Sequence, residues 1–313
     1  MILFLVFWPI VILSIPHQFL DLGGDSAQYI ILAQSISRGT GYRAVNYPDS
    51  PFCYHYPPVF PLLLSSIVYF FGGNLYPMHI LIALLGFLSL LFLYKLFRKY
   101  ADKEFAFLAV FLLAANYIFV IYSSNFILSD IPYVFFSGLA LLFAARYLNK
   151  DNWMNKQGYL LLLFLTLAYF TRYAGVALFL GILIVLLSSS SKQKFRKFGF
   201  IFSGFILFFL LWQAIARSFN PSAAVSYSKQ FLLIDPYQPF LGTLLSHPQF
   251  IFVRFIAGVN YYCKILGGSF FFYFIRRWHF LAGPLSLFSF LITLFGLWQQ
   301  FRKDKSCVFC YYF

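Results

Sequence analysis

Asp25 is the residue of this chain best placed to do chemistry. It lies in the stretch Asp-Leu-Gly-Gly-Asp-Ser-Ala-Gln-Tyr at residues 21–29, directly after the first hydrophobic segment, in a chain with nine acidic residues among 313. A carboxylate in this position could act as a general base or a metal ligand. It could also cap a helix, because Gln28 three residues later completes a capping box. The two roles are compatible, since a capping carboxylate keeps free lone pairs.

A second acid has the same ambiguity. Asp130 lies in the sequence Ser-Asp-Ile-Pro at residues 129–132, a pattern typical of a helix start with proline in the first turn. Its carboxylate could also face a reacting group. We therefore predict Asp25 and Asp130 as the candidate catalytic residues.

Cationic side chains near these acids could bind phosphate. Arg172 lies between two apolar segments, where a charge is costly unless it is paired. Its guanidinium matches a phosphate bidentately, and the alternative is that it only reaches toward the membrane interface. Arg43 and His55 are weaker phosphate candidates. No glycine-rich phosphate loop, zinc motif or Ser/His/Asp arrangement is present, and Cys307-x-x-Cys310 lacks the second pair of a zinc site, so we predict no metal ligands.

The composition indicates which elements must position these groups. Hydrophobic residues make up 61% of the chain and charged residues 10%, with a mean hydropathy of +0.79. Soluble domains carry about 25% charged residues, so the chain is predicted to be an all-α polytopic membrane protein. The net charge of +14 falls in short clusters between apolar segments. That pattern indicates membrane orientation and contact with membrane lipid, and it argues against nucleic acid as a partner.

We predict about eight transmembrane helices. Basic clusters at residues 95–103, 146–156, 192–197 and 302–305 alternate with the apolar segments. If all four clusters are cytoplasmic, the N-terminus is cytoplasmic as well. A chain with basic residues on both sides of residues 159–187 must turn back near residues 171–173. The predicted spans are residues 1–15, 76–94, 105–122, 131–148, 159–170, 175–187, 198–216 and 280–301.

Two shorter segments are predicted to lie on the membrane surface. Residues 58–71 are too short for a span and contain Pro61, and residues 26–38 place apolar and polar side chains on opposite helical faces. Both fall in an outer loop at residues 16–75. We expect three parts: a transmembrane catalytic core at residues 1–217, an outer loop at residues 218–279, and residues 280–313 with the last span. The tail after that span is either truncated or the end of a small version of a larger protein.

The order of short motifs along the chain is similar to that of a known family. The motifs are Gly24-Asp25-Ser26-Ala27-Gln28-Tyr29, Gly39-Thr40-Gly41-Tyr42, Tyr56-Pro57-Pro58, Leu128-Ser129-Asp130-Ile131-Pro132 and Phe170-Thr171-Arg172-Tyr173-Ala174-Gly175. Over roughly residues 1–190 the chain resembles bacterial members of the dolichyl-phosphate-mannose-protein mannosyltransferase family, including the aminoarabinose lipid A transferases.

The resemblance implies a GT-C-like helical bundle and a glycosyltransferase. Such enzymes pass a sugar from a polyprenyl-phosphate donor to a protein, lipid or glycan acceptor on the outer face of the bacterial inner membrane, with inversion. Asp25 matches the acid of the first loop, with Ser26 where a second acid is often found. Arg172 matches a position that is often Lys or Arg, and Tyr56 stands where many members have a basic residue. With Tyr29, these residues complete the predicted substrate-binding set. No cofactor is required, although a divalent cation could bridge carboxylate and phosphate.

Two other functions fit the same residues. A transporter or flippase would use Asp25 and Asp130 as ion or substrate sites, but such proteins place ionisable residues within spans and carry internal repeats. A membrane scaffold would use both acids only as caps. It predicts that Asp25→Asn is functionally silent.

Overall fold

The computed structural model describes residues 8, 11–13, 15, 24–53, 55–219, 233, 242–244, 246–259 and 295. Three predicted parts lie mostly outside the described residues: the first span, the last span and the outer loop 218–279. The chain divides into two compact units, residues 1–216 with 300–313, and residues 217–299.

The described part of the first unit is helical. It contains no strand, and an isolated bridge pairs Arg43 with Phe52. Asparagine side chains cap three of the helices: Asn74, Asn116 and Asn155 accept backbone N–H groups of the first turns of α4, α6 and α8. The helices are α2 (Asp25–Ser37), α3 (Val59–Phe71), α4 (Leu75–Phe97), α5 (Lys103–Ala114), α6 (Tyr117–Ser124), α7 (Asp130–Leu148), α8 (Lys156–Thr171), α9 (Gly175–Ser188) and α10 (Lys194–Phe219).

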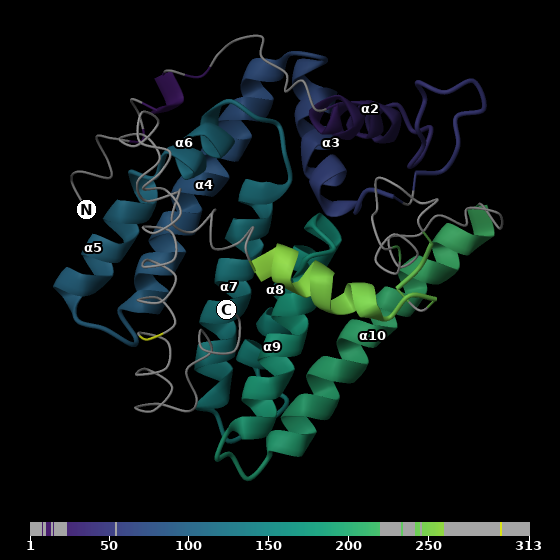
Figure 1. The fold of residues 1–313 in the computed structure, drawn as a ribbon. Coiled ribbons are helices and arrows are strands. Elements are labelled where there is room, and N and C mark those ends of the chain that lie inside the picture. Colours follow the sequence, from purple (N-terminus) through teal and green to yellow (C-terminus); the bar gives the residue numbers. More distant parts are fainter. Residues whose placement is uncertain are drawn as a thin grey trace. The chain divides into compact units, whose positions relative to one another are not determined.

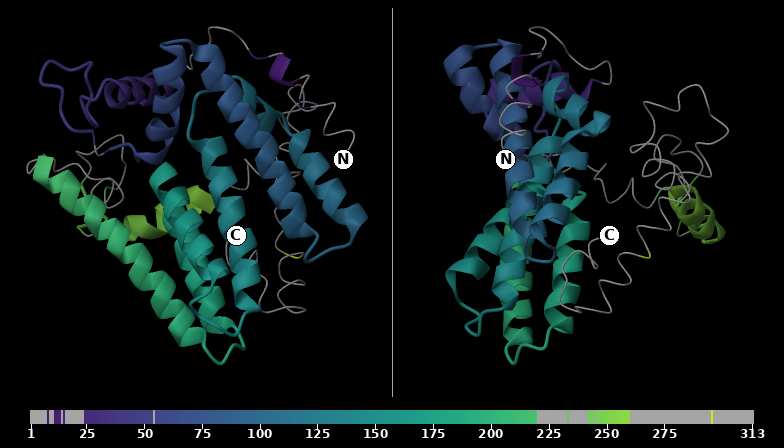
Figure 2. Two further views of the ribbon diagram at one scale, coloured as in Figure 1. Left: turned by 180° about the vertical axis from the view of Figure 1, so that it is seen from behind. Right: turned by 90° about the vertical axis from the view of Figure 1, so that its left-hand side faces the viewer.

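Helix α7 lies at the centre of the packing. It contacts α4 on one side and α8 and α9 on the other, and most of its residues are buried (Figures 1 and 2). Small residues such as Gly138, Ala140 and Ala144 let the neighbouring helices approach closely. One apolar cluster joins α7, α8, α9 and α10, and a second joins α2, α3, α4 and α6.

Two lysines hold the C-terminal end of α7. Lys99, after α4, donates to the carbonyl of Ala145. Lys197 on α10 is fully buried and donates to the carbonyls of Tyr147 and Leu148 at 3.3 and 3.1 Å. The last carbonyls of a helix have no partner within the helix and carry partial negative charge, so both lysines stabilise this end.

The predicted count of eight spans is not confirmed. Among the described residues, the three helices α4, α7 and α10 are long and apolar enough to cross a membrane. Helices α5 and α6 together pass the same test as a pair bent by 62°, so the span predicted at residues 105–122 is broken into two helices. The break falls at Asn116, whose side chain accepts from Phe119 N and starts a new helix in another direction.

The predicted turn near residues 171–173 is confirmed. Helix α8 ends at Thr171 and α9 begins at Gly175. The two helices have 16 and 14 residues, which is below the roughly 20 residues that a span usually needs. The turn is tight, because a Cβ atom at Gly175 would lie 2.7 Å from the Tyr169 Cα.

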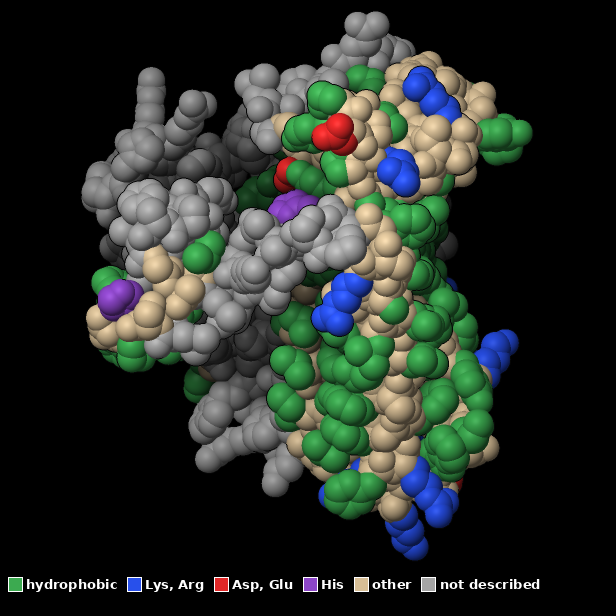
Figure 3. Space-filling model, turned by 90° about the vertical axis from the view of Figure 1, so that its right-hand side faces the viewer, with side chains coloured by type: hydrophobic (Ala, Val, Ile, Leu, Met, Phe, Trp, Pro, Cys, Tyr) green, Lys and Arg blue, Asp and Glu red, His purple; other side chains and the backbone are tan. Residues whose placement is uncertain are grey.

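Opposite ends of the bundle differ in composition. Helices α2 and α3 pack together, and α2 lies across one end of the bundle rather than along it (Figures 1 and 2). The basic residues Lys95, Arg98, Arg146, Lys156 and Lys194 lie at the other end, where α4 and α7 finish and α8 and α10 begin. Figure 3 shows hydrophobic side chains along the face that carries α10, with lysine and arginine side chains at its lower end.

The second unit is described only in part. A helix runs over Gln249–Val259. Arg254 on this helix donates to the Leu233 carbonyl at 2.7 Å, and Leu233 forms an isolated bridge with Thr243.

The α8–α9 turn leads to a stability prediction. We expect Gly175→Ala to lower the stability by about 1–3 kcal/mol, because the added methyl group overlaps rigid backbone rather than a movable side chain. Gly199→Ala on α10 is the matched control, since nothing lies within 4 Å of its Cβ position. Thermal unfolding of the purified protein in detergent measures both. Equal melting temperatures for the two variants would contradict the close packing at Gly175.

Candidate functional site

Asp25 does not cap α2. The N-cap is Gly24, with a left-handed φ of 83°, and it makes no side-chain cap hydrogen bond. Asp25 is the first residue of the helix, and the backbone N–H of Gln28 bonds to the Gly24 carbonyl. The predicted capping box is therefore wrong, because the glycine conformation starts the helix one residue earlier. The exposed Asp25 carboxylate accepts a hydrogen bond from the Tyr56 hydroxyl at 2.8 Å.

Asp130 forms an ion pair with Arg172. It is the first residue of α7, and Ser129 before it makes no side-chain cap bond. The pair joins the start of α7 to the end of α8. The Arg172 side chain is 43% exposed and that of Asp130 34%, so both remain accessible from solvent. The ion pair with Asp130 lowers the free-energy cost of a charged Arg172 in an apolar bundle. Because the side chain is partly exposed, it could also bind an anion.

Tyr29 connects the two acids. Its hydroxyl shares a 3.0 Å hydrogen bond with the Ser129 hydroxyl. Its ring packs edge-on against the Tyr56 ring, with 5.0 Å between the ring centroids. A chain of contacts thus runs from Asp25 through Tyr56, Tyr29 and Ser129 to Asp130. Burial raises the pKa of Tyr29 to about 12, while the Ser129 hydrogen bond lowers it and the Asp25 charge adds to the increase. Tyr29 therefore stays neutral and serves as a structural link.

Tyr56 and His55 come from the segment before α3. Burial, and then the hydrogen bond to Asp25, raise the pKa of Tyr56 well above its ordinary value. The hydroxyl therefore keeps its proton and remains a donor to the carboxylate. Burial also lowers the pKa of His55, although nearby Asp25 opposes this. At neutral pH the half-buried imidazole is thus uncharged and acts as a hydrogen-bonding group rather than a cation.

Arg43 lies in a different setting from the other predicted residues. Its Nη1 donates to the Ser50 carbonyl at 3.2 Å, within the loop that follows α2. Tyr42 anchors this loop, because its hydroxyl donates to the carbonyls of Tyr56 and Pro57 at 2.9 and 3.2 Å. Arg43 therefore shapes a loop beside the site. Hydrogen bonds, ring contacts and the ion pair connect the other predicted residues.

Sequence reasoning missed two residues that hold the site together. Ser129 was treated only as part of a helix start, and Tyr42 only as part of a motif. The rings of Tyr42 and Phe52 pack against the Trp212 ring of α10, with 5.9 and 6.1 Å between ring centroids. The signal in the sequence was a serine directly before an acid and a tyrosine after two glycines, but neither pattern names its partner.

The donor set bears on metal binding. Within the described part of the chain, no group of three or more His, Cys, Asp or Glu side chains could hold a metal ion. Asp25 could contribute a single carboxylate to a cation that arrives with a phosphate.

The arrangement offers two complementary functions. An exposed carboxylate oriented by a tyrosine hydroxyl can accept a proton. A half-exposed arginine held by a second carboxylate can bind a phosphate. Tyr29 brings these two groups to the same end of the bundle.

Comparisons with known proteins place the chain in a family. The model of the dolichyl-phosphate-mannose-protein mannosyltransferase family matches residues 55–215, more than half of the chain. This region contains Tyr56, Asp130 and Arg172. No curated protein and no solved structure matched. The family consists of membrane glycosyltransferases of the GT-C type that use polyprenyl-phosphate-linked sugars. The chain belongs to the dolichyl-phosphate-mannose-protein mannosyltransferase family.

Proposed function

We propose that this protein transfers a sugar from a polyprenyl-phosphate carrier to an acceptor on the outer face of the bacterial inner membrane, with inversion at the anomeric carbon. Membership of the family supports the reaction class. The observation that carries the proposal is the exposed Asp25 carboxylate. Tyr56 orients this carboxylate by a hydrogen bond, and the carboxylate does not cap α2. The acceptor is a hydroxyl group of a protein, lipid or glycan at the membrane surface.

Asp25 is the proposed general base. Its Oδ1 accepts from Tyr56, which leaves Oδ2 for the acceptor. The acceptor oxygen attacks the anomeric carbon from the side opposite the phosphate and forms the new C–O bond. The bond from that carbon to the phosphate oxygen breaks, and its electron pair leaves with the carrier phosphate. The acceptor proton moves to Asp25.

Arg172 is the proposed phosphate-binding residue. The leaving carrier phosphate gains negative charge as the bond breaks, so a cation at this point stabilises the transition state more than the ground state. Asp130 positions the guanidinium by its ion pair. In our proposal His55 and Tyr56 contact the sugar or its phosphate, Tyr29 shapes the same pocket, and Arg43 approaches from the neighbouring loop.

Our proposed orientation puts the Asp25 end outside and the basic end in the cytoplasm. The positive-inside rule supports this, because basic residues gather where α4 and α7 end. Helices α2 and α3 would then lie along the outer surface. We propose residues 1–217 as the catalytic core and residues 218–279 as a further outer segment, with a cytoplasmic N-terminus.

The transporter alternative gains less support. It would use Asp25 and Asp130 as ion sites, but Asp130 already pairs with Arg172. A cation at Asp130 would have to displace or approach that guanidinium, which is electrostatically unfavourable.

Asp25→Asn tests the proposed base. We expect sugar transfer to fall by about 10²–10⁴-fold, because an amide cannot accept the acceptor proton. The assay measures incorporation of labelled sugar from polyprenyl-phosphate mannose, and from a panel of other sugars on the same carrier, in membranes that carry each variant. Asp49→Asn, an exposed acid in the loop after α2, is the control at matched expression. Equal incorporation by Asp25→Asn and the unmodified protein would contradict the proposed role of Asp25 as the general base.

Arg172 variants test phosphate binding. Arg172→Gln is expected to lower transfer by about 10²–10³-fold, and Arg172→Lys by less, since lysine keeps the charge but loses the bidentate fork. Asp130→Asn should cost less than Arg172→Gln, because it removes only the positioning partner. Transfer rates and KM for the donor, measured for all three variants, check this order. A larger loss in Asp130→Asn than in Arg172→Gln would assign the chemistry to the acid instead.

Reporter fusions test the orientation in a bacterial host. Alkaline phosphatase fused after Gly73 should be active, because the proposal puts this turn outside. The same reporter fused after Asn152, in the turn between α7 and α8, should be inactive, and green fluorescent protein there should fluoresce. The reverse pattern would place Asp25 on the cytoplasmic side.

A further inference from the structure

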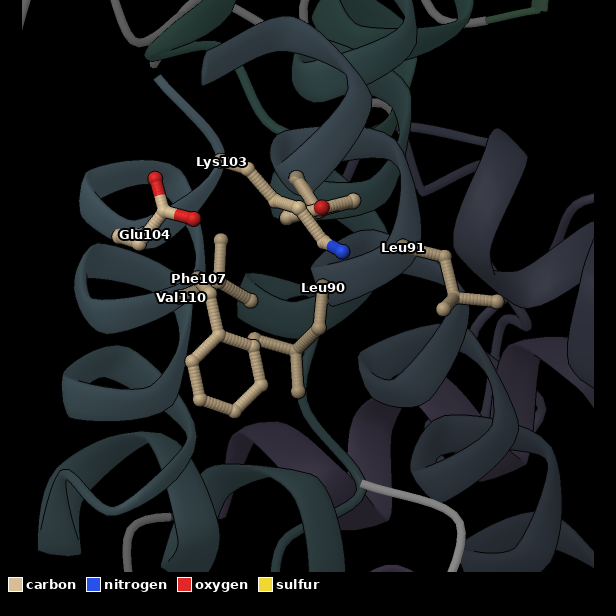
Figure 4. A pocket seen from close by; sticks show the side chains of 7 residues that line it. Leu90, Leu91, Lys103, Glu104, Phe107 and Val110 are labelled. Carbon is tan, nitrogen blue, oxygen red and sulfur yellow. The ribbon is translucent and has the colours of Figure 1, made fainter. Parts of the chain in front are cut away.

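A cavity of about 430 Å³ lies between α4 and α5. It is formed by the last two turns of α4 and the first two turns of α5, at the basic end of the bundle (Figure 4). The site at Asp25 and Asp130 lies at the starts of α2 and α7, at the opposite end. The cavity is therefore separate from the proposed chemistry. Its lining residues are Leu90, Leu91, Tyr94, Lys103, Glu104, Phe107 and Val110.

The wall of the cavity is mainly apolar. Leu90 and Val110 are buried, while Leu91 and Phe107 are partly exposed beside them. The outward face of α5 is apolar as well, with Phe105, Leu108, Phe111 and Leu112 all exposed. An apolar cavity does not hold water favourably. In a membrane, a cavity of this kind next to a lipid-facing helix suits a hydrocarbon chain.

One cation sits at the edge of this apolar wall. Lys103 is exposed, and its side chain points toward Leu90 and Leu91, while the exposed Glu104 beside it also lines the cavity (Figure 4). Among the described residues, no hydrogen bond or ion pair engages Lys103. Lys95 and Arg98 of the preceding turn are exposed too. A lysine that reaches from an apolar groove to the membrane boundary meets the level of lipid phosphates.

We propose that this cavity binds one anionic phospholipid. An acyl chain fills the space between α4 and α5, and the headgroup phosphate pairs with Lys103. The bound lipid would bridge the last turns of α4 and the first turns of α5, next to the bend between α5 and α6. This proposal is independent of the sugar transfer proposed above.

Native mass spectrometry of the delipidated full-length protein in detergent tests the site. The probes are phosphatidylglycerol and phosphatidylcholine with identical acyl chains. We expect phosphatidylglycerol to form a one-lipid adduct in preference to phosphatidylcholine. Lys103→Gln should lower that preference about fivefold, the effect of one lysine near an anionic lipid surface. Lys156→Gln, an exposed lysine at the same end outside the cavity, should leave it unchanged.

A second pair of variants tests the acyl chain. Leu91→Trp fills the cavity and should lower the adducts of both lipids, whereas Leu163→Trp, at an exposed position on α8, should not. Inorganic phosphate should fail to displace phosphatidylglycerol, because it cannot fill the apolar cavity. Equal binding of both lipids to the unmodified protein, an unchanged preference in Lys103→Gln, or displacement by phosphate would each overturn the proposal. Lys103→Gln changes an exposed residue, so its result stands even if Leu91→Trp does not fold.

Discussion

The ion pair between Asp130 and Arg172 is the interaction on which the candidate site depends. A charge in an apolar bundle is costly unless it is neutralised, and Asp130 and Arg172 come from different helix ends. Each residue neutralises the charge of the other, and their ion pair connects the start of α7 to the turn after α8. Both side chains remain partly exposed, which is why we propose Arg172 of this pair as the residue that binds the carrier phosphate.

The remaining site residues extend from this pair through neutral groups. Ser129 shares a hydrogen bond with Tyr29, and Tyr29 packs against Tyr56, which donates to Asp25. Each contact joins segments that are far apart in the sequence. The hydroxyls stay protonated because burial raises the pKa values of both tyrosines, so the chain of contacts carries no further charge into the bundle. The carboxylates of Asp25 and Asp130 and the Arg172 side chain all remain at least partly exposed.

The other end of α7 shows the complementary arrangement. Lys99 and Lys197 donate to its last carbonyls, whereas Asp130 lies in its first turn. This polarity matches the helix dipole, with an acid at the start and cations at the end. Lysine is thus structural at α7, whereas Lys103 at the α4–α5 cavity is open toward the membrane boundary.

The amino-acid sequence by itself determined the class of fold, the family and the identity of the charged candidates. Long apolar runs can only form helices in a membrane, and charges are so rare in this chain that Asp25, Asp130 and Arg172 stand out. It also located the turn at residues 171–173, since basic residues flank both sides of that segment. The local sequence pattern predicted a capping box at Asp25 that does not form, and it did not predict the break at Asn116. Both features depend on the neighbouring segments, which set the conformation of the glycine and the direction of the new helix. The partners themselves, Tyr56 with Asp25, Ser129 with Tyr29 and Arg172 with Asp130, were decided only by the tertiary structure, because hydrogen bonds and ion pairs between distant segments leave no spacing signal in one chain.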